Sequence, residues 1–161
     1  DVYKRQHDGR LVWNWDSNNP DDTKPLAPGK TYSRNSANMW SLASVDENLG
    51  MIYLPLGNQT PDQWGADRTP GAEKFSAGIV ALDLASGKVR WNYQFTHHDL
   101  WDMDVGSQPT LVHLKTDDGV KPAIIVPTKQ GSLYVLDRRD GTPIVPIREI
   151  PTPQGLSLIH I

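Results

Sequence analysis

The chain has 161 residues, a formal net charge of -3, thirteen Gly, thirteen Pro, six Trp and no Cys. Its length suits about one domain, and its charge gives no reason to expect binding to nucleic acid or to an anionic membrane surface. The lack of Cys excludes disulfides and thiolate metal sites, and no apolar run approaches the length of a membrane span. The abundance of Gly, Pro and Trp favours a turn-rich all-β chain over a helical one.

The two ends of the chain are related at the nucleotide level. One set of codons for residues 1–6 has a reverse complement that translates to residues 156–161. An inverted repeat of this kind resembles the mosaic end of a transposon used to build sequencing libraries. We interpret both hexapeptides as translated adapter and exclude them from the fold. We expect the natural segment to span residues 7–155, with both termini of its parent protein outside it.

A turn followed by a strand recurs along the chain. Residues 8–15 begin with Asp-Gly and then alternate like a strand, and the same pattern returns at residues 83–93. In both copies Gly is followed four residues later by Trp, whereas a third copy at residues 137–145 has Val145 in the Trp position. A repeated turn and strand, with Trp docking between copies, indicates stacked β-blades.

The remaining strands fit four to a blade. They are predicted at Ser41–Asp46, Met51–Leu56, Ala77–Leu84, Lys88–Phe95, Pro109–Leu114, Pro122–Pro127, Gly131–Leu136 and Thr142–Ile147. No segment has the pattern of an amphipathic helix. Alternation and turns also suit a β-sandwich, but the Gly–Trp spacing favours a propeller. Two long polar segments, 16–39 and 57–75, lie outside the strands and are expected to be binding loops or decoration.

The stretch His97–Asp104 places two His and three Asp within eight residues, directly after a predicted strand. Crowded carboxylates repel one another unless a cation, a cofactor or a substrate proton uses them. The stretch is therefore a candidate site. The same residues also suit a solvated acidic loop that Trp101 anchors in the core.

Four segments, taken together, resemble the dehydrogenases that use pyrroloquinoline quinone (PQQ), and most closely the membrane-bound quinoprotein glucose dehydrogenase family. They are Trp40, Gly57–Trp64, His97–Asp104 and Pro127–Arg138, which occur in the family's order. The resemblance covers essentially all of residues 7–155. It implies an eight-bladed β-propeller with the cofactor on its axis, of which about two to three four-stranded blades are present. A blade stack cut open leaves unpaired edges, so the fragment is expected to be unstable and inactive alone.

The resemblance implies that Asp102 is the catalytic base and that Lys129 faces the quinone oxygens. Oxidising an alcohol requires an acceptor for the hydroxyl proton while hydride leaves the carbon, and an ammonium stabilises the negative charge that grows on a reduced quinone. The spacing of 27 residues places both side chains at the same end of neighbouring blades. By themselves, Asp102 also suits a turn cap and Lys129 a surface lysine. The methanol dehydrogenase branch carries Arg in place of Lys129, so Lys favours the sugar and polyol branch.

The resemblance also implies residues for the cofactor and for a divalent ion. Trp40 matches the residue that stacks on the flat quinone, although core packing would also suit a Trp. Asn58, Thr60 and Asp102 match ligand positions for calcium or magnesium, which prefer oxygen donors, although the segment at 58–61 also suits an ordinary turn. His98 suits either an orienting role beside the acids or a structural one.

The function implied is oxidation of an aldose, such as glucose to its lactone, with hydride passing to PQQ and electrons to ubiquinone. The catalytic domain would face the periplasm, attached to the inner membrane through parts outside this chain. Quinate, shikimate or another polyol is the alternative substrate. A non-catalytic propeller of the outer-membrane assembly type is the alternative of another class, since it shares the Trp docking repeats.

Overall fold

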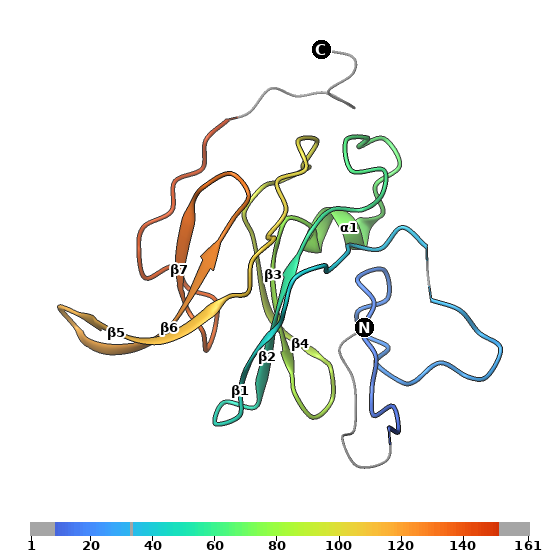
Figure 1. The fold of residues 1–161 in the computed structure, drawn as a ribbon, viewed down its shortest axis with the longest axis horizontal. Helices are drawn as coiled ribbons and strands as arrows, with labels where there is room; N and C mark the ends of the chain where they lie inside the picture. Colours follow the sequence, from blue (N-terminus) through green and yellow to red (C-terminus); the bar gives the residue numbers. More distant parts are fainter. Residues whose placement is uncertain (1–8, 33, 152–161) are drawn as a thin grey trace.

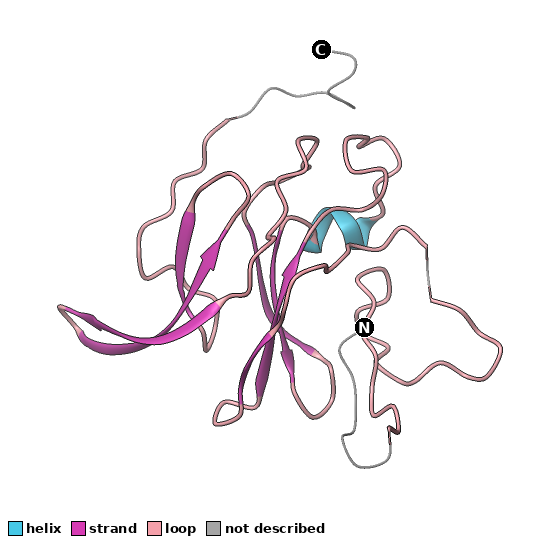
Figure 2. Cartoon of the chain, in the orientation of Figure 1, coloured by secondary structure: helices cyan, strands magenta, loops and turns pink. Residues whose placement is uncertain are grey.

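The computed structural model describes residues 9–32 and 34–151. These residues form two antiparallel β-sheets side by side, with a long N-terminal segment beside the first sheet (Figure 1). Strands dominate the regular structure (Figure 2). The two hexapeptides interpreted as adapter, and the outermost residues of the expected natural segment at 7–8 and 152–155, lie outside the described residues.

Within the described residues each sheet is a simple meander of consecutive strands. The first sheet contains β1 (Ser44–Asp46), β2 (Met51–Leu56), β3 (Gly78–Asp83) and β4 (Val89–Gln94). The second contains β5 (Thr110–Thr116), β6 (Gly119–Pro127) and β7 (Leu133–Asp137). Every neighbouring pair is antiparallel, which is the arrangement of propeller blades. The predicted all-β fold of stacked blades is confirmed.

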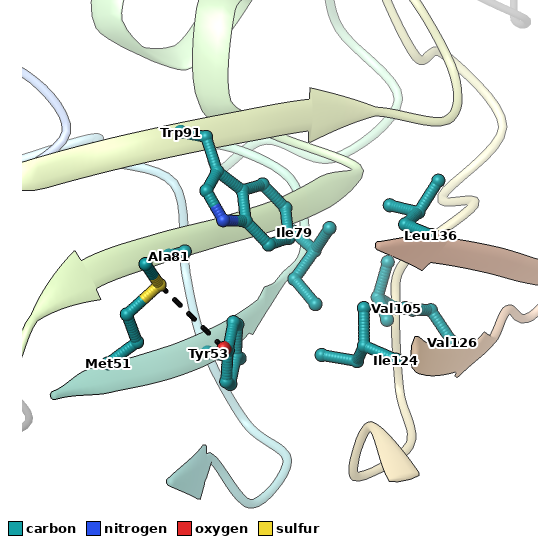
Figure 3. Packing of buried hydrophobic residues seen from close by; sticks show 9 residues of the cluster. All are labelled: Met51, Tyr53, Ile79, Ala81, Trp91, Val105, Ile124, Val126 and Leu136. Carbon is teal, nitrogen blue, oxygen red and sulfur yellow. Dashed lines mark hydrogen bonds between the residues drawn. The ribbon is translucent and has the colours of Figure 1, made fainter. Parts of the chain in front are cut away.

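One core fills the space between the two sheets. Because successive side chains of a strand point to opposite faces, Met51, Tyr53 and Ile79 face the second sheet, where they join Ile124 and Leu136 in one buried cluster (Figure 3). These five side chains are at most 4 % exposed. The contact between the sheets is thus as well buried as the interior of an independent domain.

A second core lies on the opposite face of the first sheet. Ile52 and Val80 alternate with the residues of the first core and pack with Trp13 and Phe75, and Met39 lies at the edge of this cluster. Strands β2 and β3 are therefore buried on both faces. This double burial explains why they read as nearly continuous apolar runs in the sequence.

The Gly–Trp repeat docks each unit on the next, as the sequence predicts. A Cβ atom on Gly87 would lie 2.5 Å from the ring of Trp13, and one on Gly141 would lie 2.6 Å from the ring of Trp91. In both places the indole N–H donates to the carbonyl oxygen three residues before the glycine, at 2.9 and 3.2 Å. Each tryptophan therefore needs a glycine in the following unit, because any side chain there would occupy the space of the ring.

Two of the predicted strands are wrong, and the others are present with ends shifted by up to three residues. Residues 9–15 pair with no strand among the described residues, and the Asn14 N–H donates instead to the Thr23 carbonyl (3.0 Å). Trp13 is nevertheless buried against the first sheet. The predicted strand Thr142–Ile147 makes a single bridge, between Leu136 and Pro143. The prolines in this segment have no N–H to donate, which prevents a regular ladder.

The structure also contains a short helix that the sequence analysis missed, α1 (Pro70–Phe75). Its cap is Thr69, whose side chain accepts a hydrogen bond from the Ala72 N–H (3.0 Å). Pro70 begins the helix, where its missing N–H costs nothing. Six residues are too few for a helical period to show, so the Thr-Pro pair was the available signal.

Arg138 links the two sheets through polar contacts. Its buried guanidinium donates to Asp46 of β1 (2.6 Å) and to the carbonyl of Val112 in β5 (2.7 Å). Its own carbonyl accepts hydrogen bonds from Tyr53 (2.9 Å) and Trp91 (3.2 Å). Burial raises the pKa of Asp46, but backbone hydrogen bonds and the guanidinium together outweigh it, and the net pKa is lowered.

Replacing the glycine under Trp91 tests the docking contact. Gly141 has a φ of +78°, so Gly141→Ala carries both backbone strain and a clash with the indole. We expect a loss of about 2–4 kcal/mol in the free energy of unfolding of the full-length parent, measured by urea denaturation. Gly50→Ala is the control, because Gly50 has a φ of +61° and no atom within 4 Å of the added Cβ. It should cost only about 1 kcal/mol, and equal losses would contradict the docking role.

Removing the charge that joins the sheets should be more costly. Arg138→Met leaves the Asp46 carboxylate buried without its cation, which typically costs about 3–5 kcal/mol. The double variant Arg138→Met/Asp46→Leu removes both charges and should recover much of that loss, again by urea denaturation. A double variant no more stable than Arg138→Met would show that the ion pair is not the cause.

Candidate functional site

The candidate site lies where three loops meet at one end of the two sheets. These loops follow β2 (57–77), β4 (95–109) and β6 (128–132). In an antiparallel meander the loops that leave alternate strands lie at the same end, and Figure 1 shows all three together at the top of the molecule. Side chains far apart in the chain can therefore combine there.

Asp102 and Lys129 form an ion pair between the Asp102 Oδ2 and the Lys129 Nζ. The structure therefore brings together the two residues predicted at the same end of neighbouring blades. Their side chains are 30 % and 46 % exposed, so the pair is open to solvent. The hydrogen bond with Asp102 raises the pKa of Lys129. Asp102 also has a φ of +60°, a strained value for a residue with a side chain and one that clusters at functional sites.

Asp99 organises the loop that carries Asp102. Its Oδ1 accepts from the Trp101 N–H (2.8 Å), and its Oδ2 accepts from the Met103 N–H (2.7 Å) and from Asn58 Nδ2 (2.9 Å). Burial raises the pKa of Asp99, although the two backbone hydrogen bonds lower it. A buried carboxylate with three donors serves to hold the loop, which leaves Asp102 as the more accessible of the two acids.

Asp104 is the other buried acid of the stretch. Its Oδ2 accepts from the Trp40 indole N–H (3.1 Å) and its Oδ1 from the Asn58 backbone N–H (3.0 Å). Its carbonyl accepts from the Lys129 N–H (3.1 Å). Burial and the neighbouring Asp102 carboxylate raise the pKa of Asp104. Asp104 therefore joins its own loop to the other two loops of the site and to the segment that carries Trp40.

Trp40 presents an open aromatic face beside these acids. Trp40 is 60 % exposed and belongs to neither of the two cores of the described residues. The six-membered ring of the indole rests on Gly106, where a Cβ atom would lie 2.3 Å from Cη2. An exposed indole held at both ends is suited to stacking on a flat ligand.

The two predicted metal ligands of the 57–77 loop lie in different environments. Asn58 is fully buried, and its Oδ1 already accepts from Arg68 Nη1 (2.6 Å), whereas Thr60 is exposed. No three His, Cys, Asp or Glu side chains gather in a metal-binding group within residues 9–32 and 34–151. An ion bound at Asn58 would have to share its oxygen with a guanidinium. Arg68 was not among the predicted site residues; its signal was one of only two basic residues in the 57–77 loop.

The two histidines of the stretch contact residues other than those of the ion pair. His98 Nδ1 lies 2.8 Å from Glu73 Oε1 of α1, and its ring fills the space above Gly65. His97 is 63 % exposed and contacts Gln94 through Nδ1 (2.7 Å). These contacts favour the structural interpretation of both residues.

A groove of about 380 Å³ runs beside the stretch. Trp101 and Met103, which flank Asp102 in the chain, line it together with Gln130, the neighbour of Lys129. The stacked rings of Phe95 and Tyr134, 4.1 Å apart, form part of its wall. The groove therefore lies next to the segments that carry the ion pair, with aromatic side chains from β4 and β7, Tyr93 and Tyr134, in its lining.

Comparison with known proteins places this geometry in a family. The family described as "PQQ: Glucose/ethanol/alcohol dehydrogenase, beta-propeller domain" matches residues 5–158. The chain belongs to this PQQ dehydrogenase family. Within the described residues, no helix is long and apolar enough to cross a membrane.

The sequences of several relatives align with most of this chain. Quinoprotein glucose dehydrogenase from Gluconobacter oxydans (strain 621H) is 51% identical over 157 residues, covering 96% of this chain and 19% of its own length. Glycerol dehydrogenase large subunit from the same strain is 44% identical, with 90% and 20% covered. Quinate/shikimate dehydrogenase (quinone) from Acinetobacter baylyi (strain ATCC 33305 / BD413 / ADP1) is 42% identical, with 89% and 18% covered. The chain therefore spans about a fifth of the length of these relatives.

The fold agrees with solved structures of the family. The crystal structure of quinohemoprotein alcohol dehydrogenase from Comamonas testosteroni superposes with a TM-score of 0.60 at 31% identity. The match covers 73% of this chain and 18% of that one. The two sheets are therefore part of a PQQ dehydrogenase propeller, consistent with the predicted fragment of an eight-bladed one.

Membership of the PQQ dehydrogenase family implies PQQ as cofactor, and the described residues fit a flat quinone. Trp40 offers an exposed aromatic face, and Lys129 offers a cation. Both residues donate hydrogen bonds to Asp104. The Trp40 indole N–H donates to the Asp104 carboxylate, and the Lys129 backbone N–H donates to the Asp104 carbonyl oxygen. Asp104 thus links the planar face to the segment that carries the positive charge, and the binding of a reducible ring requires both.

Loss of the loop-organising carboxylate should loosen the site. Asp99→Asn turns one acceptor oxygen into a donor that faces an N–H group, so we expect faster hydrogen exchange at the Trp101 and Met103 amides, by roughly tenfold or more. Asp22→Asn is the control, because the Asp22 Oδ1 accepts from the Lys24 N–H (3.2 Å) in an exposed turn. Its exchange pattern should stay close to that of the parent. Unchanged exchange in Asp99→Asn would mean that the loop is held by other contacts.

Proposed function

We propose that this chain is part of a quinoprotein dehydrogenase that oxidises an aldose, such as glucose to its lactone, with PQQ as the hydride acceptor. The observation that carries the proposal is the solvent-open Asp102–Lys129 ion pair beside the exposed face of Trp40. The identity of 51% to quinoprotein glucose dehydrogenase supports the choice of substrate class.

In this proposal Asp102 accepts the proton of the substrate hydroxyl. Asp99 and Asp104 are buried and occupied by N–H donors, whereas Asp102 is half-buried and reachable from solvent. A carboxylate within hydrogen-bond reach of an alcohol is a suitable general base. The strained backbone of Asp102 fixes where its carboxylate points.

Lys129 has two roles in the same scheme. Its ammonium holds the Asp102 carboxylate in place before substrate arrives. It also provides the positive charge that stabilises negative charge developing on the reduced ring. When bound, PQQ supplies the two-electron acceptor that no side chain can provide, and Trp40 supports its plane.

A divalent ion, calcium or magnesium, completes the proposal, with Asn58, Thr60 and Asp102 as its ligands on this chain. Oxygen donors of this kind suit a hard cation. The hydrogen bond from Arg68 to Asn58 means that ion binding requires the Asn58 oxygen to share its lone pairs. Any further ligands would come from parts of the relatives that this chain does not span.

The setting of the whole protein is part of the proposal too. We infer that residues 7–155 belong to a larger dehydrogenase in the inner membrane, with its catalytic domain in the periplasm and ubiquinone as electron acceptor. The two terminal hexapeptides would then be translated adapter. The chain spans about a fifth of its relatives, so the isolated fragment is expected to be inactive.

A second substrate is supported by the same comparisons. The glycerol and quinate/shikimate dehydrogenases are 44% and 42% identical to this chain, close to the value for the glucose enzyme. Kinetics of the full-length parent with glucose, glycerol and quinate would choose among these substrates. Failure of the parent to bind PQQ would instead favour a non-catalytic propeller.

Replacing the proposed base tests the central role. In the full-length parent, Asp102→Asn should lower kcat by about 10²–10⁴ with PQQ still bound, because an amide cannot accept the proton. The measurement is steady-state turnover together with PQQ stoichiometry. Asp118→Asn, on an exposed turn at 83% side-chain exposure, should behave as the parent enzyme. Full turnover by the PQQ-loaded Asp102→Asn variant would rule Asp102 out as the base.

A further inference from the structure

Asp104 has contacts that a loop-capping acid does not need. It is 4% exposed, and its two carboxylate oxygens accept from different segments, the Trp40 indole and the Asn58 backbone. Its carbonyl accepts from the Lys129 N–H. One residue therefore contacts the aromatic face, the 57–77 loop and the segment that carries the cation.

The indole of Trp40 is fixed at both ends by one short stretch of chain. Its N–H is held by the Asp104 carboxylate (3.1 Å), and the far edge of its ring rests on Gly106. The stretch 104–106 begins two residues after Asp102. The position of the aromatic face is thus tied directly to the segment that presents the carboxylate of the ion pair.

The surroundings of Asp104 are shaped to admit its carboxylate. A Cβ atom on Gly57 would lie 2.5 Å from the Asp104 Oδ1 and 2.4 Å from the Asn38 Oδ1. Only glycine at position 57 leaves room for both oxygens. Because two N–H donors converge on the carboxylate, an amide in its place would have to direct its own N–H₂ group at one of them.

We propose that Asp104 is a positioning residue that fixes the Trp40 indole, and with it the cofactor plane, relative to the Asp102–Lys129 pair. This inference rests on the proposed function, because it assigns Trp40 to cofactor stacking. Asp104 acts on the cofactor plane through Trp40, and its carboxylate also lies beside that of Asp102. A hydrogen bond from an indole to a carboxylate limits the tilt of the ring, and hydride transfer depends steeply on such alignment.

A double-mutant cycle in the full-length parent tests this role. Equilibrium dialysis would measure the affinity of the apoenzyme for PQQ, at a fixed calcium concentration, in the parent, Asp104→Asn, Trp40→Phe and the double variant. Trp40→Phe keeps an aromatic ring but removes the indole N–H. Asp104→Asn should raise the Kd for PQQ by about tenfold, and should add little to the rise in the Trp40→Phe background, because the contact is already lost.

Asp99→Asn is the matched control for the cycle. It changes a buried acid of the same loop that has no hydrogen bond to Trp40 among those described. Its effect on PQQ affinity should therefore add to that of Trp40→Phe. Additive effects of Asp104→Asn and Trp40→Phe would overturn the proposal, and so would an unchanged Kd in Asp104→Asn. An affinity restored to the parent value by excess calcium would also overturn it, because Asp104 would then act through the ion.

A measurement without cofactor separates this proposal from the proposed function. In 5-fluorotryptophan-labelled apoenzyme, the ¹⁹F resonance that Trp40→Phe removes belongs to Trp40. That resonance should shift or broaden in Asp104→Asn and stay unchanged in Asp22→Asn, which alters only an exposed turn. An unchanged Trp40 resonance in Asp104→Asn would overturn the positioning role. If the resonance shifts in Asp104→Asn but the parent enzyme binds no PQQ, the positioning contact stands, whereas the stacking role of Trp40 and the proposed function are overturned.

Discussion

The buried contact between the two sheets at Arg138 is the constraint on which the site depends. Asp102 follows the last strand of one sheet, and Lys129 follows the middle strand of the other, so their distance is set by how the sheets pack. Arg138 fixes that packing in two ways. Its guanidinium donates a hydrogen bond to Asp46 across the interface, and its carbonyl oxygen accepts hydrogen bonds from the Tyr53 hydroxyl and the Trp91 indole N–H. These polar contacts are directional, whereas the surrounding apolar cluster alone would tolerate some sliding of one sheet over the other.

The three acids of the 97–104 stretch show how environment separates their roles. Asp99 and Asp104 are buried, and burial raises the pKa of each carboxyl group. The carboxylate oxygens of both residues accept hydrogen bonds from N–H donors. Asp102 instead faces solvent and a lysine. Three aspartates within six positions thus have three different surroundings. Asp99 holds the loop, Asp104 holds the Trp40 indole, and Asp102 remains accessible. The two buried acids hold the loop in the shape that leaves the third free to meet a ligand.

Much of the fold could be predicted because its strongest signals are local or repeated. Periodic Gly and Trp mark each docking contact, and apolar runs mark β2 and β3. The errors arose where backbone chemistry overrides side-chain pattern. Prolines break the ladder at Thr142–Ile147 despite its apolar residues, and a Thr cap with Pro starts a helix too short to show a period. In the site, the two ends of the ion pair could be named, but Arg68 could not, because its partners lie in two loops that are far apart in the chain.

The sequence by itself determined the fold class, the family and the identity of the residues that meet where the three loops lie together. Motifs and periodicity can be recognised in short runs of consecutive residues. The tertiary structure decided which acid is left accessible, that Trp40 is an open face, and that both histidines point to structural partners. Burial and hydrogen-bond partners come from segments tens of residues apart, and no local pattern encodes how those segments pack.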